Sequence, residues 1–174
     1  MRDVVWMRNI TIFAFMERES VVIFPGSFDP FTRGHAAVVE EALRLFDKVV
    51  IGVGDNISKR GLLAVEQRVA MIEEIYASNP RVEVRTYRSL TGDFALECGA
   101  RAIVRGVRTG YDIEYEQNMA SVNRHLFPSL STVILCTPAE LSHISSSVVR
   151  ELLSFGRDVS EFLPVGVDIN KYIK

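Results

Sequence analysis

The sequence predicts an α/β protein, a single domain built on a doubly wound, parallel sheet of five strands. From residue 21 onward, apolar runs of strand length alternate with segments whose apolar residues recur at helical spacing. Such alternation is typical of parallel strands joined by right-handed crossover helices. The chain has 174 residues, the length of one domain with a substantial core, and it shows no internal repeat or low-complexity linker.

The composition is that of an ordinary globular protein, with 48% hydrophobic and 24% charged residues. The formal net charge of -2 argues against nucleic-acid binding driven by bulk charge, although it leaves room for a local basic pocket. Cys98 and Cys136 lie far apart without metal-ligand spacing. We therefore expect buried free thiols in a reducing cytoplasm rather than a disulfide.

Residues 1–19 form an N-terminal extension of open role, and the predicted domain covers residues 20–174. The apolar segments of the extension are split by Arg8-Asn9 and are too short to span a bilayer. They lack a small-residue cleavage site, so we expect no signal peptide, no membrane association and a cytoplasmic location. Three alternatives stay open: translation from a start upstream of Met16, an extra edge strand, or a contact segment.

In the first half of the domain, the first strand is an apolar run that begins at Val21 and ends at Pro25-Gly26. A helix is expected over residues 34–46, because its apolar residues fall on one face and its charged residues on the other. A second buried strand follows at 48–53, and the same helical spacing predicts a helix over 65–77.

In the second half, a third strand is expected at 82–87, followed by a short helix over 91–98 that Gly99 closes in a C-cap role. A fourth strand at 102–105 leads directly into the glycine-bearing run from 106 to 110.

A long helix is expected over 111–127, where Pro128 ends it. One side of it gathers the polar residues Asp112, Glu116 and Asn123. The other side carries an apolar stripe, which consists of Tyr111, Tyr115, Met119, Val122 and Leu126.

The last elements are a fifth strand at 132–136 and a helix over 148–155 that begins after Ser145-Ser146-Ser147. A C-terminal helix is expected over 164–172, with Pro164 at a position that the first turn of a helix permits.

The stretch from Val21 to His35 has the features of a phosphate site. A strand ends at Pro25-Gly26, a loop of small and hydroxyl-bearing residues follows, and Gly34-His35 begins a helix. Backbone N–H groups and the positive end of the helix dipole both favour an anion at such a helix start. His35 alone could equally be a local capping or packing residue, but beside this turn a functional role is favoured.

Two other phosphate-binding motifs are excluded. The chain contains no G-x-x-x-x-G-K-[ST], so it is not a P-loop protein. Gly52-Val53-Gly54 follows a strand, but position 57 is Ile rather than Gly and no helix follows promptly, which rejects a dinucleotide-binding fingerprint.

The strand order indicates where these segments meet. With the common order 3-2-1-4-5, ligands bind at the carboxyl ends of the first and fourth strands, which lead into Gly26-Ser27 and the run 105–108. Residues 144–147, ahead of a helix, are a second candidate anion site. Helix capping by serine is the alternative interpretation, but a cap needs only one serine and this segment has three. Candidate phosphate partners, each of which alone is more often a solvated surface charge, are Lys59, Arg105, Arg108 and Arg124.

Five segments, taken together in chain order, resemble a known family. They are Phe24–His35 (FPGSFDPFTRGH), Arg105–Arg108 (RGVR), Asp112–Glu116 (DIEYE), Asn123-Arg124 and Ile144–Ser147 (ISSS). The chain resembles bacterial phosphopantetheine adenylyltransferase from about residue 20 to its last helix. The T-x-G-H element is shared by the wider nucleotidyltransferase superfamily, whereas R-G-[VIL]-R followed by D-[FI]-E-Y-E is much more specific to this family.

This resemblance implies a Rossmann-like nucleotidyltransferase fold and transfer of the adenylyl group of ATP to 4′-phosphopantetheine. The products would be dephospho-coenzyme A and pyrophosphate, and the reaction would use Mg2+. The family likeness also implies a homohexamer that coenzyme A inhibits.

Site residues follow from the resemblance position by position. Lys59 and Arg105 would hold the acceptor phosphate, with Ser27 contacting both substrates and Thr91 lining the pantetheine side. The residues implied to contact ATP are Ser27, Phe28, His35, Gly106, Val107, Arg108, Glu116, Leu141, Ser142, His143, Ile144, Ser145, Ser146 and Ser147. The sequence departs from the usual family pattern at Ser27, commonly Thr, at Leu141, commonly aromatic, and at His143, commonly Phe.

The implied chemistry needs no enzymic nucleophile, because a phosphate acceptor is already nucleophilic at neutral pH. What remains is positioning of two polyanions and stabilisation of charge on the α-phosphate, for which His35 is the predicted donor. We expect Mg2+ to bridge phosphates and keep its waters, without a dedicated carboxylate cage.

Two alternatives remain at this stage. A sister adenylyl- or cytidylyltransferase of the same superfamily would act on nicotinamide mononucleotide or glycerol phosphate, but it would lack the block from Arg105 to Glu116. A catalytically idle nucleotide-binding or assembly module is disfavoured by the joint presence of His35, Lys59, Arg105 and the three serines.

Overall fold

The computed structural model describes residues 19–55 and 61–173, and in this part of the chain five strands form one parallel sheet. The strand order is β3-β2-β1-β4-β5, which confirms the expected doubly wound topology and its switch point between β1 and β4. The strands are β1 (Val21–Gly26), β2 (Lys48–Gly54), β3 (Val82–Tyr87), β4 (Ala102–Val107) and β5 (Ser131–Cys136).

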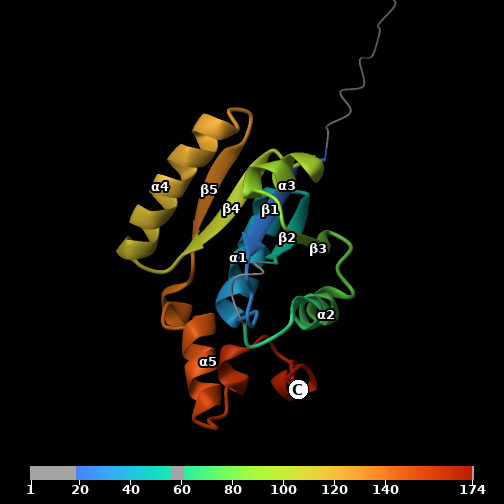
Figure 1. Ribbon diagram of the computed structural model, residues 1–174, viewed down its shortest axis with the longest axis vertical. Helices are drawn as coiled ribbons and strands as arrows, with labels where there is room; N and C mark the ends of the chain where they lie inside the picture. The colour runs from blue at the N-terminus through green and yellow to red at the C-terminus, as the bar shows by residue number, and fades with distance from the viewer. Residues whose placement is uncertain (1–18, 56–60, 174) are drawn as a thin grey trace, which may run out of the picture.

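Helices cover both faces of this sheet (Figure 1). Val22 and Phe24 of β1 belong to the larger core, whereas Ile23 between them belongs to the smaller core on the opposite face. The larger core includes residues of α1 (Arg33–Leu45), α2 (Val65–Tyr76) and α5 (Ser146–Ser154), and the smaller one packs beneath α3 (Thr91–Glu97). The helix α4 (Gly110–Leu126) runs beside β4 and β5 (Figure 1).

The sheet opens at its switch point. Six residues of β1 pair with β2, but only Val22 and Ile23 pair with β4, opposite Ala102 and Ile103. The pairing with β4 ends before Pro25, a residue with no N–H to donate. The carboxyl ends of β1 and β4 therefore diverge, which leaves room for side chains and ligands between them.

The strand β4 is two residues longer than expected, so Gly106 and Val107 are its last residues rather than part of a turn. Val107 is buried, and its carbonyl accepts a hydrogen bond from the N–H of Thr137. The extra length carries the strand up to the edge of the crevice.

The expected helix over 164–172 is wrong. This segment contains two turns around a 3-10 helix at Ile169–Lys171, and another 3-10 helix lies at Ser160–Phe162. Gly166 has φ +86, a left-handed conformation that ends a helical path. Ile169 and Tyr172 of this segment are nevertheless buried in the larger core, whereas Val165 is fully exposed.

The helix α4 turns its polar face, not its apolar stripe, toward the sheet. Glu116 is its only buried residue, whereas Tyr111 is 87% exposed. The rest of the stripe, Tyr115, Met119, Val122 and Leu126, is exposed as well. An apolar stripe open to solvent is a feature of interaction surfaces.

Two smaller expectations concern the thiols and the membrane. Both cysteines are free, but Cys98 is only half-buried and Cys136 is exposed, so the expected burial is wrong. Among the described residues, no helix is long and apolar enough to cross a bilayer.

Candidate active site

The turn after β1 places an aromatic ring beside His35. Phe28 has φ +49, a backbone conformation that is uncommon for a residue with a side chain, and its ring is buried. The Phe28 ring meets the His35 ring edge-on at 5.1 Å between centroids. A Cβ on Gly26 would lie 2.7 Å from the Phe28 ring, so only glycine fits at the end of β1.

Contacts from elsewhere in the fold fasten this turn. The Asp29 carboxylate accepts hydrogen bonds from the N–H groups of Leu62 and Leu63, each at 2.8 Å. Three backbone carbonyls of the turn also accept side-chain donors: Ser27 from Arg68 at 2.8 Å, Asp29 from Arg150 at 2.6 Å and Pro30 from Ser146 at 2.8 Å. The turn is thus rigid before any ligand arrives.

Thr32 determines which nitrogen of His35 carries the proton. The Thr32 N–H donates to Nδ1 of His35 at 3.0 Å, so Nδ1 is an acceptor and the proton of the neutral ring is on Nε2. Burial, with smaller contributions from Arg108 and Arg105, lowers the pKa of His35 to about 4. At neutral pH His35 is therefore a neutral hydrogen-bond donor through Nε2.

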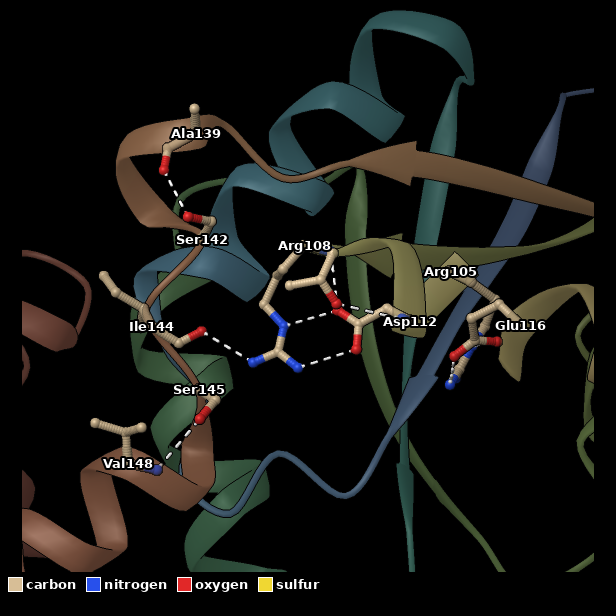
Figure 2. Close-up of polar contacts among 10 residues, drawn as sticks. Arg105, Arg108, Asp112, Glu116, Ala139, Ser142, Ile144, Ser145 and Val148 are labelled. Atoms are coloured by element: carbon tan, nitrogen blue, oxygen red, sulfur yellow. Dashed lines mark hydrogen bonds and ion pairs between the residues drawn. The ribbon is translucent and has the colours of Figure 1, made fainter. Parts of the chain in front are cut away.

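A polar cavity of about 350 Å3 lies between the start of α1, the start of α5 and Arg108. The Arg108 guanidinium donates to both oxygens of Asp112, Nε to Oδ2 at 3.1 Å and Nη2 to Oδ1 at 3.2 Å, and its Nη1 lies 3.5 Å from the Ile144 carbonyl (Figure 2). Burial alone would raise the pKa of Asp112, but the hydrogen bonds from Arg108 outweigh it and hold the pKa below its usual value. Ser145 caps α5, its Oγ accepting from the Val148 N–H at 3.2 Å.

A second cavity of about 230 Å3 lies over the end of β1, next to Arg105. Arg105 donates to both oxygens of Glu116, Nε to Oε2 at 2.7 Å and Nη2 to Oε1 at 2.6 Å (Figure 2). Its Nη1 donates to the Pro25 carbonyl at 2.8 Å, across the gap where β1 and β4 diverge. Glu116 is buried, so this bidentate pair is fixed tightly against the sheet.

The two cavities share three lining residues, Ser27, His35 and Gly106. Of the other residues predicted to contact substrates, the larger cavity is lined by Arg108, Glu116, Ile144, Ser145, Ser146 and Ser147, and the smaller by Phe28 and Arg105. The structure therefore brings together four segments of the sequence around these cavities: residues 27–35, 105–108, 116 and 144–147.

Several predicted residues do not line either cavity. Val107 is buried in β4, and Thr91 begins α3 with its hydroxyl 3.4 Å from that of Tyr87. In the loop before α5, Leu141 ends a short 3-10 helix, the Ser142 hydroxyl donates to the Ala139 carbonyl and the His143 ring packs on Phe162. Lys59 lies outside the described residues. Their predicted substrate contacts stay predictions.

Further residues, which were not predicted to contact a substrate, line the larger cavity as well. They are Thr32, Gly34, Asp112, Tyr115 and Arg150, of which all but Arg150 belong to the motifs already described. Arg150 could have been found, because it is three residues after Ser147 in a helix and so lies on the same face. Its Nη2 is 3.1 Å from the Ser147 hydroxyl.

A further cavity, of about 680 Å3, lies at the β3 edge between α2 and the end of β3. None of the residues predicted to contact substrates lines it. Size alone therefore does not locate the site; the convergence of donors and cations around His35 does.

The acidic residues of the site bear on metal binding. The described residues contain no group of three or more His, Cys, Asp or Glu that could hold a metal ion. The two carboxylates at the larger cavity, Asp112 and Glu116, are both engaged by arginines. Both of these carboxylates are therefore occupied by guanidinium groups rather than free to bind a metal ion.

Comparisons with known proteins agree with this geometry. The cytidylyltransferase-like family model matches residues 23–152. The fold is similar to that of a bifunctional NMN adenylyltransferase/ADP ribose pyrophosphatase from Francisella tularensis, with a TM-score of 0.65 at 18% identity over 83% of this chain and 45% of that chain. Fold and site thus define a nucleotidyltransferase of the cytidylyltransferase-like class.

Curated relatives give the particular family. The chain is 54% identical over 149 residues to the phosphopantetheine adenylyltransferase of Porphyromonas gingivalis, covering 86% of this chain and 97% of that protein. Identity to the Phocaeicola vulgatus enzyme of the same name is 52%, with 85% and 97% covered, and to the Levilactobacillus brevis enzyme 41%, with 83% and 90% covered. The chain belongs to the phosphopantetheine adenylyltransferase family.

Proposed function

We propose that this protein transfers the adenylyl group of ATP to 4′-phosphopantetheine, yielding dephospho-coenzyme A and pyrophosphate. One observation carries the proposal: two adjoining cavities, one beside Arg108 and one beside Arg105, share Ser27, His35 and Gly106. A transferase for two phosphorylated substrates needs two such anion sites that meet at one donor.

The larger cavity is the proposed ATP site. The N-termini of α1 and α5 both open onto it, and each presents free backbone N–H groups and the positive end of a dipole. Arg108 and Arg150 add two guanidinium groups. These groups suit the β- and γ-phosphates, and Mg2+ bound to ATP would offset the remaining negative charge.

The smaller cavity is the proposed site of the acceptor phosphate. Arg105 has two N–H groups beyond the three that bind Glu116 and Pro25, so it can face a phosphate without losing its fixed position. We propose that Lys59 assists it and that Thr91 lies on the pantetheine side. Both cations would reduce repulsion between the reacting anions.

In the reaction, an oxygen of the acceptor phosphate attacks the α-phosphorus, and the bond from that phosphorus to the bridging oxygen breaks as pyrophosphate leaves. His35 donates its Nε2–H to a non-bridging oxygen of the α-phosphate as negative charge shifts there. His35 stays neutral and transfers no proton, in accord with its lowered pKa.

The direct test is pyrophosphate release with ATP and 4′-phosphopantetheine, measured beside nicotinamide mononucleotide and glycerol phosphate as acceptors and CTP as donor. We expect release only with ATP and 4′-phosphopantetheine. Turnover of another acceptor would indicate a sister transferase, and no release with any pair would indicate an idle nucleotide-binding module. Running full-length protein beside a form that starts at Met16 tests whether residues 1–15 matter to activity.

We also propose that the protein is a cytoplasmic homohexamer that coenzyme A inhibits. The exposed apolar stripe of α4 supports an assembly, because Tyr111, Met119, Val122 and Leu126 have no partner within the described part of the protomer that buries them. Coenzyme A contains both an adenosine portion and a pantetheine arm, so it could occupy both cavities at once.

A further inference from the structure

Arg68, on the first turns of α2, reaches from outside the cavities to the backbone at their junction. Its Nη1 donates to the Ser27 carbonyl at 2.8 Å and lies 3.4 Å from the Gly54 carbonyl. Neither the sequence motifs nor the lining of the two cavities includes Arg68.

The position of these two carbonyls explains why a side chain is needed there. Gly26 and Val53 form the last paired position of β1 and β2, so Ser27 and Gly54 come directly after the ladder of backbone hydrogen bonds has ended. Arg68 links the two chains one residue beyond that end. Arg68 thereby extends the connection between the β1 and β2 segments by one residue, to Ser27, which lines both cavities.

Packing or stability alone does not account for this arginine. Its Nε is buried without a hydrogen-bond partner among the described residues, which costs free energy. None of the ion pairs in the described part of the chain involves Arg68, so its charge is not compensated by a carboxylate there. A positive charge directly behind Ser27 is instead favourable where two phosphorylated substrates meet.

We propose that Arg68 is a positioning residue for adenylyl transfer: it holds the Ser27 backbone so that the Ser27 hydroxyl and N–H face both substrates. The inference rests on the proposed function. Arg68 acts through Ser27 and touches neither substrate, so its loss should misplace the substrates relative to each other rather than remove a binding contact.

Kinetics of Arg68→Met and Arg68→Lys test the proposal. We expect Arg68→Met to lower kcat by about 10- to 100-fold, as small misplacements at a reacting centre do, with KM values changed less than about threefold. Arg68→Lys keeps the charge and can reach one carbonyl, so it should recover part of the loss. The matched control is Arg81→Met, because Arg81 also donates to a backbone carbonyl, its Nε to that of Asp47 at 2.8 Å, and neither residue lines either cavity.

A double-mutant cycle with Ser27→Ala separates positioning from a general loss of structure. If Arg68 acts through Ser27, Arg68→Met should cost much less in the Ser27→Ala background than in the wild type. Additive effects, or an Arg68→Met variant with normal kcat, would overturn the proposal. If Arg68→Met does not fold, the same cycle with Arg68→Lys decides. An inactive wild type would refute the proposed function instead, so the two failures are distinguishable.

Discussion

His35 acquires its chemical state from its neighbours. The Thr32 N–H fixes Nδ1 as an acceptor, and burial beside Arg108 and Arg105 keeps the ring neutral. The neutral ring can donate only through Nε2, the atom that we propose binds the α-phosphate. A histidine at the start of a helix can be recognised in a sequence, but this tautomer and pKa depend on contacts that the sequence does not display.

Replacement of His35 by Ala should lower kcat by about 10²- to 10³-fold, the usual loss for one donor to a developing oxyanion, while ATP binding changes little. Steady-state kinetics and equilibrium ATP binding check the two parts separately. Near-normal turnover, or an equal loss of ATP binding, would contradict the assigned role. The ring is already neutral at pH 6. The pH profile of kcat should therefore show no titration of His35 near pH 6.5, and His35→Gln should leave the shape of that profile unchanged in this range.

The lowered pKa of His35 also predicts a pH-dependent stability. In the unfolded chain its pKa is near 6.5 and in the folded protein about 4, so its stabilising contribution is complete above pH 6.5. As pH falls from 6.5 to 4, the unfolded chain takes up a proton that the folded site resists, and this contribution is lost. Between pH 7.5 and 4.5 the loss is about 2 to 3 kcal/mol.

Urea unfolding of wild type and His35→Gln at both pH values measures this difference. The wild type should lose more unfolding free energy on acidification than the variant, since other titrating groups are common to both. Equal losses in the two proteins would mean that His35 titrates normally in the folded state.

At the scale of elements, the sequence predicted the five strands, their order and the helices α1 to α5. The apolar periodicity coincides with burial in α1, α2 and α5, but not in α4, whose apolar stripe is exposed. It failed at 164–172, where Pro164 is compatible with a helix start but Ile169 and Tyr172 are separate anchor points on the core. Tyr172 shows such an anchor, since its hydroxyl donates to Glu74 of α2. A proline that the first turn of a helix permits does not by itself require a helix.

The strand β4 packs so closely against α1 that one added methyl group should disturb the contact between them. A Cβ on Gly106 would lie 2.6 Å from the Cγ2 of Val38, one turn along α1 from His35. Gly106→Ala should therefore displace the start of α1 and lower kcat by about tenfold or more, since such shifts misplace the donor. Gly110→Ala is the control, because a Cβ there meets nothing within 4 Å. Equal kcat values for the two variants would show that the added methyl group is accommodated without displacing His35.

At the scale of the whole molecule, the site is assembled from the ends of two strands and the starts of two helices. Motifs could be matched to this crevice from the sequence because a doubly wound sheet gathers such ends at its switch point. Arg68 could not be, since it belongs to none of the motifs and acts on the turn after β1 from α2, whereas Arg150 could have been found from its spacing to Ser147. The sequence also showed the stripe on α4 but not that it faces away from the sheet, because a stripe is equally consistent with a core contact.

That outward stripe predicts the effect of charge on assembly. Val122→Glu with Leu126→Glu places two carboxylates on the exposed stripe, in the half of α4 away from Tyr115, which lines the larger cavity. If the stripe is buried between protomers of a hexamer, the charges must be desolvated without partners there, and the assembly should dissociate into smaller species. Sedimentation velocity at a fixed protein concentration measures the change.

The double variant Phe155→Glu/Val165→Glu is the control. It adds the same charge at exposed apolar positions outside α4 and should leave the wild-type sedimentation coefficient unchanged. A stripe variant that sediments like the wild type would place the subunit contacts elsewhere on the protomer.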